Sequence, residues 1–179
     1  MSELTPRERV MLALDHKETD RVPRDFGSTF ATSITRVAYE NLLHYLGIKE
    51  EIKIMKKATQ VVIPSEAILE RFDIDCRGIH IQCGDGFPII KSPQEFLDEW
   101  GVTYFKPDSS FYFDAMNFPL RGEPDWEKAK SFPWPDPLNE GRIRGLLEEA
   151  KYLHEKTDYA VILNYPYGSK LESWNRFPK

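Results

Sequence analysis

The sequence predicts an α/β fold that forms a partial (β/α)8 TIM barrel, with about three strand-helix units and an inserted β-hairpin. Apolar residues recur at helical spacing over residues 33–46 and 139–156. Residues 159–163 form a continuous apolar run, which is typical of a strand buried in a parallel sheet. Because a closed barrel of this kind needs roughly 250 residues, we expect the 179 residues to form its N-terminal portion as a single domain.

A capped helix and a short strand are predicted first. Thr5 can cap the helix, Pro6 suits its first position, and Glu8 is placed to complete a capping box. After a helix-breaking Asp-Arg-Val-Pro sequence, we interpret Val22–Phe26 as the first barrel strand, because Gly27 then marks a loop.

Two further helices and a second strand follow. The helix over residues 33–46 is expected to end at Gly47, a residue typical of a helix C-cap. A shorter helix is predicted to begin near Ser65. It leads into Cys76–Gln82, which we expect to be the second strand.

The rest of the chain predicts a hairpin, a connector, a helix and a strand. Aromatic, β-prone residues over 102–113 flank a polar loop, which indicates a hairpin. Three prolines in residues 132–137 exclude a helix there. The long helix over 139–156 and the strand over 159–163 complete a pattern typical of βαβ units.

The composition excludes several classes of protein. With 41% hydrophobic and 30% charged residues the chain is typical of a globular protein, and its net charge of −5 argues against a nucleic-acid partner. Cys76 and Cys83 are too few for a disulfide framework, so we expect reduced thiols. No segment has the pattern of a signal peptide or a membrane span, which predicts a cytoplasmic protein without a membrane partner.

Five segments carry a resemblance to a known family. They are residues 4–10 (Leu-Thr-Pro-Arg-Glu-Arg-Val), 16–23 (His-Lys-Glu-Thr-Asp-Arg-Val-Pro), 72–77 (Phe-Asp-Ile-Asp-Cys-Arg), 98–102 (Asp-Glu-Trp-Gly-Val) and 134–137 (Trp-Pro-Asp-Pro). In this order and at this spacing the chain resembles the uroporphyrinogen decarboxylase (URO-D) superfamily, especially its methyltransferase-like branch. The resemblance covers nearly the whole chain up to Tyr167 and implies about the first half of a barrel. Residues 169–179 depart from it as an atypical tail, which a truncated gene, a frameshift or a fragment would each explain.

The methyltransferase-like branch implies methyl transfer between a corrinoid carrier and a thiol or another one-carbon acceptor. That branch commonly uses a zinc ion, which lowers the pKa of the thiol. Its zinc ligands lie in the second half of the family barrel, and this chain has no His-x-Cys pair. We therefore expect no metal ligands and no cofactor held by this chain alone, with corrinoid and zinc confined to a complete protein.

The alternative reaction in the superfamily is decarboxylation of a tetrapyrrole. Family decarboxylases carry an Arg-rich loop after the first strand, where guanidinium groups pair with the carboxylates of the substrate. Here a single Arg24 stands next to Asp25, and no Asp is evident after the second strand. The sequence thus disfavours this alternative.

Site residues are expected at the C-terminal ends of the predicted barrel strands, where barrel enzymes gather their function. An Asp after a strand also commonly caps a loop, and aromatic side chains pack in a core as readily as they flank a flat ligand. With these structural roles left open, the catalytic candidates are Asp25 and His80, and the substrate-binding candidates are Arg24, Gln82, Asn164, Tyr165 and Tyr167.

A third interpretation is a non-catalytic assembly module. An open half barrel exposes sheet edges, which need a partner strand or another cover. The expected partners are therefore a small-molecule or corrinoid-protein substrate and, in this interpretation, a second copy of the chain or a complementary half-barrel.

Overall fold

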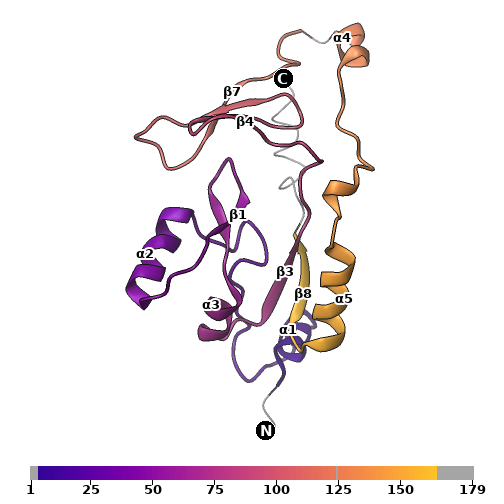
Figure 1. Cartoon of the computed structure of the whole chain (residues 1–179). Helices are drawn as coiled ribbons and strands as arrows, with labels where there is room; N and C mark the ends of the chain where they lie inside the picture. Colours follow the sequence, from indigo (N-terminus) through magenta and orange to yellow (C-terminus); the bar gives the residue numbers. More distant parts are fainter. Residues whose placement is uncertain (1–3, 124, 165–179) are drawn as a thin grey trace. The chain divides into compact units, whose positions relative to one another are not determined.

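The computed structural model describes residues 4–123 and 125–164, which form a mixed α/β structure with small sheets (Figure 1). The chain divides into two compact units, and each is described by itself. Unit 1 contains residues 4–81 and 145–164, and unit 2 contains residues 82–123 and 125–144.

The helices and strands follow one another along the chain as a mixture of hairpins and isolated helices. Unit 1 contains α1 (Pro6–Leu14), α2 (Arg36–Leu46), β1 (Lys53–Lys56), β2 (Val61–Ile63), α3 (Glu66–Arg71), β3 (Cys76–His80), α5 (Leu146–Lys156) and β8 (Ala160–Asn164). Unit 2 contains β4 (Ile89–Ser92), β5 (Glu95–Leu97), β6 (Thr103–Phe105), β7 (Asp114–Asn117), α4 (Trp126–Ser131) and the 3-10 helix η1 (Glu140–Arg142).

The start of α1 confirms the predicted capping box. The Thr5 hydroxyl accepts a hydrogen bond from the Glu8 amide, and the Glu8 carboxylate accepts one from the Thr5 amide at 2.9 Å. These bonds satisfy two backbone donors that a helix start would otherwise leave open. Pro6 occupies the first turn, where its missing N–H has no cost.

The helix α2 packs on the β1–β2 hairpin and forms the apolar core of unit 1 (Figure 1). Tyr39 and Leu43 on α2 are buried with Val62 on β2 and Ile68 on α3. The C-cap prediction is confirmed, because Gly47 has a φ of 69°, a left-handed conformation that favours glycine.

Strands β3 and β8 form a parallel pair, with Cys76 opposite Ala160 at one end and His80 opposite Asn164 at the other. The helices α1 and α5 both contact β8, and α5 also contacts β3 (Figure 1). Leu163 on β8 is 62% exposed. The prediction that this strand is buried on both faces is therefore wrong.

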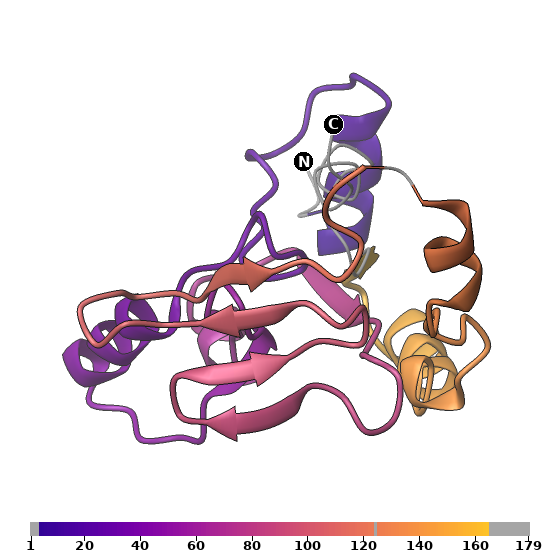
Figure 2. The ribbon, with the colours of Figure 1, turned by 90° about the horizontal axis from the view of Figure 1, so that it is seen from above.

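Unit 2 contains a four-stranded antiparallel sheet in the order β4-β5-β6-β7, whose strands lie side by side in Figure 2. The predicted hairpin forms with β6 as its first strand, but its second strand is β7 and not residues 111–113. The pairing of β4 with β5 was not predicted. On the sheet, Phe96 stacks on Tyr104 with ring centroids 4.8 Å apart and meets the edge of Phe113 at 5.0 Å. This aromatic cluster forms the buried centre of unit 2.

The prediction of a partial TIM barrel is wrong. Among the described residues β3 and β8 are the one parallel pair, and the other two sheets are antiparallel. The predicted first strand, Val22–Phe26, does not form. Pro23 lacks an N–H, and the Arg24 amide donates to the side chain of Asp75 instead of a neighbouring strand. In unit 2 the turns between strands are too short for the crossovers that parallel strands require.

Other predicted boundaries shift for local reasons. The long helix predicted over 139–156 begins only at Leu146, because Gly145 has a φ of 76° and interrupts the helical path. The second helix begins at Arg36 and the third helix follows Ser65 as its N-cap. The connector over residues 132–137 contains no helix or strand, as its prolines predicted.

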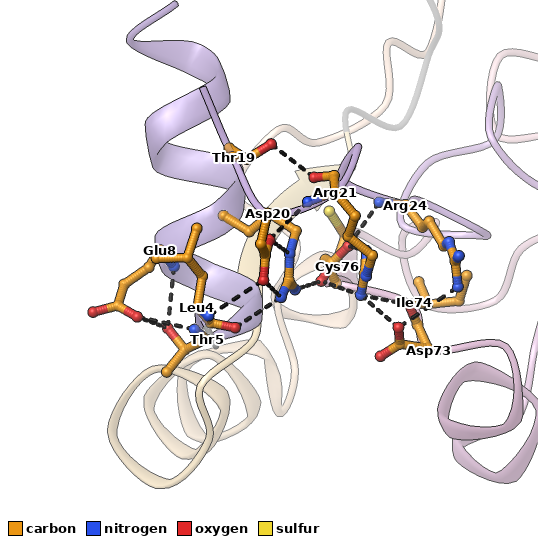
Figure 3. A network of polar contacts seen from close by, with 12 residues as sticks. Leu4, Thr5, Glu8, Thr19, Asp20, Arg21, Arg24, Asp73, Ile74 and Cys76 are labelled. Atoms are coloured by element: carbon orange, nitrogen blue, oxygen red, sulfur yellow. Dashed lines mark hydrogen bonds and ion pairs between the residues drawn. The ribbon is translucent and has the colours of Figure 1, made fainter. Parts of the chain in front are cut away.

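A buried carboxylate, Asp75, joins α1 and the following segment to the start of β3. The Asp75 side chain is 0% exposed and accepts hydrogen bonds from Arg9 Nη1 at 2.6 Å, Arg21 Nη1 at 2.6 Å and the Arg24 amide at 2.7 Å. Arg9 also forms a two-point ion pair with Asp20, at 2.6 and 2.7 Å. Figure 3 shows this network, in which Asp20 and Arg21 lie between α1 and Arg24.

The network changes the pKa values of its members. Burial alone would raise the pKa of Asp75, but hydrogen bonds from Arg21, the Arg24 amide and Arg9 outweigh it and lower the pKa. The hydrogen bond from Arg9 also lowers the pKa of Asp20 strongly. Carboxyl groups with lowered pKa values stabilise the folded state above the unfolded pKa of about 3.9, and this contribution is lost as the pH falls through the folded pKa.

Replacing Asp75 tests the importance of the network. We expect Asp75→Asn to lower the free energy of unfolding by about 3–5 kcal/mol, because the buried Arg9 and the partly buried Arg21 each lose one of their carboxylate partners. Urea unfolding followed by circular dichroism at 222 nm measures the change. Asp15→Asn is the control, since Asp15 is 59% exposed and forms a surface ion pair with Lys17, for which less than about 1 kcal/mol is expected. Equal losses in both variants would contradict the prediction.

Candidate functional site

The candidate site lies at the carboxyl ends of β3 and β8. His80 and Asn164 are the last residues of the two strands and are partners in the sheet register. Their side chains are in contact, with Asn164 Nδ2 3.3 Å from His80 Nδ1, and both residues are more than nine-tenths buried. The structure therefore brings together two of the predicted site residues. We call this pair and its neighbours the His80–Asn164 edge.

Asn164 also connects this edge to two other segments. Its Oδ1 accepts a hydrogen bond from the Phe30 amide at 3.4 Å, and its Nδ2 lies 3.5 Å from Met55 Sδ on β1. The ammonium group of Lys56 lies 4.7 Å from the centre of the Phe30 ring, a cation–π contact. The edge thus combines a neutral polar pair with an aromatic ring and a half-buried cation.

The loop over residues 27–33 is held against β3 by close backbone contact. A Cβ atom at Gly78 would lie 2.4 Å from the Ser28 carbonyl oxygen and 2.8 Å from His80 Cε1. Ser28 in turn donates from its amide and its hydroxyl to the Asp25 carboxylate. Glycine at position 78 therefore allows the loop to approach the strand next to His80.

Burial determines the charge states at the strand. It lowers the pKa of His80 below 6.5, so the imidazole is neutral at pH 7. On the same face of β3, burial first and the charge of Asp25 second raise the pKa of the Cys76 thiol to about 12. Cys76 therefore stays protonated and is a poor nucleophile at neutral pH.

The other predicted site residues are dispersed. Asp25 binds Ser28 and fixes the loop. Arg24 lies near Asp73 in the network of Figure 3. Gln82 belongs to unit 2, where its amide donates to the Arg142 carbonyl at 3.0 Å. Tyr165 and Tyr167 lie outside the described residues.

Sequence reasoning missed Phe30, Met55 and Lys56, which lie at the edge through contacts between distant segments. One signal was present for the loop that carries Phe30. A glycine inside a strand pattern, such as Gly78, often marks the close approach of another backbone. The pattern of residues 53–63 carried no comparable signal for the β1–β2 hairpin.

The described residues offer no cluster for a metal ion. Within residues 4–123 and 125–164, no three His, Cys, Asp or Glu side chains gather as metal ligands. The zinc ion implied by the family resemblance does not fit these residues, and no step is assigned to it. Over the same part of the chain, no helix combines the length and the apolar character that crossing a membrane requires.

Comparison with known proteins does not assign the chain to a family. No family model matches it, and neither a curated protein nor a solved structure does.

A titration of His80 tests its burial. We expect an imidazole pKa below 6.5, because the charged form loses hydration in the folded state. Since the unfolded chain then binds the proton more readily, stability should fall as the pH decreases from 6.5 through the folded pKa. Two-dimensional NMR of the histidine Cε1–H groups measures the pKa, and His80→Gln assigns the signal. A pKa at or above 6.5 would be evidence against the buried position.

A methyl group at Gly78 tests the packing of the loop. We expect Gly78→Ala to destabilise the protein by about 1–3 kcal/mol, the usual cost of overpacking, because its Cβ meets Ser28 backbone atoms. Gly47→Ala is the control, since a Cβ there meets no atom within 4 Å and only its positive φ is strained. Amide NMR should show shifts near Ser28 and His80 in the first variant alone. Unchanged signals there would contradict the close contact.

Proposed function

We propose that this chain contributes the His80–Asn164 edge to the substrate site of an enzyme that transfers a methyl group from a corrinoid carrier to a thiol. The observation that carries the proposal is the buried contact of His80 with Asn164 at the carboxyl ends of neighbouring parallel strands. Ligand sites in sheets with parallel strands commonly lie at such ends. The proposal concerns the chemistry and does not require a barrel.

The arrangement of the segments that resemble the URO-D superfamily supports the proposal. Arg9, Arg21 and Asp75 come from three of these segments, and they meet in one buried network. One buried network thus accounts for the charged residues that stand in these three separate segments. The same network lies at the amino end of β3, opposite to His80.

The chemistry of methyl transfer to sulfur suits a neutral imidazole. The thiol must lose its proton, its sulfur lone pair forms the new bond to the methyl carbon, and the electrons of the broken carbon–cobalt bond stay with cobalt. A histidine that is uncharged at pH 7 can accept the thiol proton. In this proposal His80 is that acceptor, Asn164 orients its ring, and Lys56 adds positive charge near the developing thiolate.

The acceptor thiol belongs to a substrate in this proposal. Cys76 is buried and protonated, so its sulfur is not suited to the reaction. Both Cys76 and Cys83 are free thiols, which suits the reducing cytoplasm that we propose as the location. The partner would be a corrinoid-carrying protein.

Corrinoid binding provides the test. We expect methylcobalamin, titrated into the chain, to quench the tryptophan fluorescence. We expect His80→Gln to weaken methylcobalamin binding about tenfold, the effect of losing roughly 1.4 kcal/mol of polar contact. His154→Gln is the matched control, because His154 is exposed on α5. Added thiol should yield a methyl thioether, detected by mass spectrometry, in the protein with His80 only.

The outcomes separate the proposal from its alternative. Absence of methylcobalamin binding, or equal affinity in both histidine variants, would contradict the role of the edge. Tighter binding of uroporphyrin III, a polycarboxylate tetrapyrrole, than of methylcobalamin would favour the decarboxylase-like alternative.

A further inference from the structure

Unit 1 contains a pocket beside the start of β3, at the opposite end of this strand from His80. This pocket has a volume of about 560 Å3 and is open to solvent. That volume lies within the range of small-molecule sites, about 300–1,000 Å3. The wall is formed by residues 23–26, Leu42, Phe72 and Ile74.

The lining of the pocket is apolar except for two adjacent charged residues. Phe26, Leu42, Phe72 and Ile74 supply aromatic and aliphatic surface, and Phe72 is 39% exposed. The charged residues are Arg24 and Asp25. An apolar wall with a few placed polar groups is the usual composition of a ligand site.

Arg24 has the capacity to bind an anion. Among the described residues its guanidinium group donates one hydrogen bond, from Nη1 to the Phe72 carbonyl at 3.3 Å. Its ion pair with Asp73 is long, at 3.6 Å, whereas Arg21 holds the same carboxylate at 2.7 Å. Figure 3 shows the Arg24 side chain beside Asp73 and Ile74. Since a guanidinium has five N–H groups, several remain for a ligand.

The Asp25 carboxylate is bound by the neighbouring loop. Both oxygens of its carboxylate accept hydrogen bonds from Ser28, one from the amide and one from the hydroxyl. Its negative charge is therefore already stabilised by two donors of the loop. The Arg24 side chain is 52% exposed and presents the available cationic group of the pocket.

We propose that this pocket binds a small aromatic or aliphatic monocarboxylate, with its apolar body against Phe26 and Phe72 and its carboxylate on Arg24. A planar guanidinium binds a carboxylate through two parallel hydrogen bonds. Binding also withdraws apolar surface of the ligand and of Phe72 from water. The site is separate from the His80–Asn164 edge, and its ligand does not depend on the proposed methyl transfer.

The test compares two probes that differ only in charge. We expect 2-naphthoate, titrated into the unaltered chain, to shift the amide NMR signals of residues 24–26 and 72–74. The neutral isostere 2-naphthamide should bind about five- to tenfold more weakly, because it lacks the charge-assisted pair with Arg24. This comparison requires no variant and so does not depend on the folding of one.

Three variants then locate the charge. We expect Arg24→Gln to lower the affinity for 2-naphthoate about five- to tenfold without changing the affinity for 2-naphthamide. Arg24→Lys should retain part of the affinity for 2-naphthoate. Arg36→Gln is the matched control, because the Arg36 side chain is also 52% exposed and its ion pair in the described part of the chain is with Glu40 on α2. The proposal is overturned if the shifts occur elsewhere, if both probes bind equally, or if Arg36→Gln weakens naphthoate as much as Arg24→Gln does.

Discussion

The buried carboxylate of Asp75 is the constraint on which unit 1 depends. A carboxylate with no exposed surface is stable only where donors surround it, and here Arg9, Arg21 and the Arg24 amide supply them. These donors come from α1 and from the segment that follows it. One residue before β3 therefore determines where two preceding segments lie. The charge that would be unfavourable in an apolar core instead specifies one arrangement of the chain.

The same end of the parallel pair is held by a second arginine on α1. Arg7 donates through Nε to the Tyr159 carbonyl at 3.0 Å and through Nη2 to the Thr157 carbonyl at 2.8 Å. Its Nη2 also reaches carbonyls in the last turn of α5, where positive charge is favourable. Helix α1 thus contacts the start of β3 through Arg9 and the approach to β8 through Arg7. This double attachment supports the register that places His80 opposite Asn164 at the far end.

Local chemistry made part of this structure predictable, and long-range pairing did not. The Thr5 capping box and the Gly47 C-cap depend on neighbours in the sequence, so both were predicted correctly. The strand Val22–Phe26 failed because its amide at Arg24 found a side-chain partner 51 residues away. The pairing of β4 with β5 likewise depends on the whole sheet. His80 was selected because it lies near a strand end, which holds for a two-stranded parallel pair as well as for a barrel.

The two ends of β3 differ in chemistry, and the segments that suggested the family resemblance contribute to one end alone. At the amino end, charged residues from the resembling segments pair with one another, and the adjacent Arg24 donates one hydrogen bond among the described residues. At the carboxyl end, Phe30, Met55 and Asn164 lie outside those segments and form an uncharged cluster with His80, beside the cation of Lys56. Residues of this charged network determine how the segments pack against one another. In the function that we propose, the reaction depends on side chains at the other end of β3, outside that network.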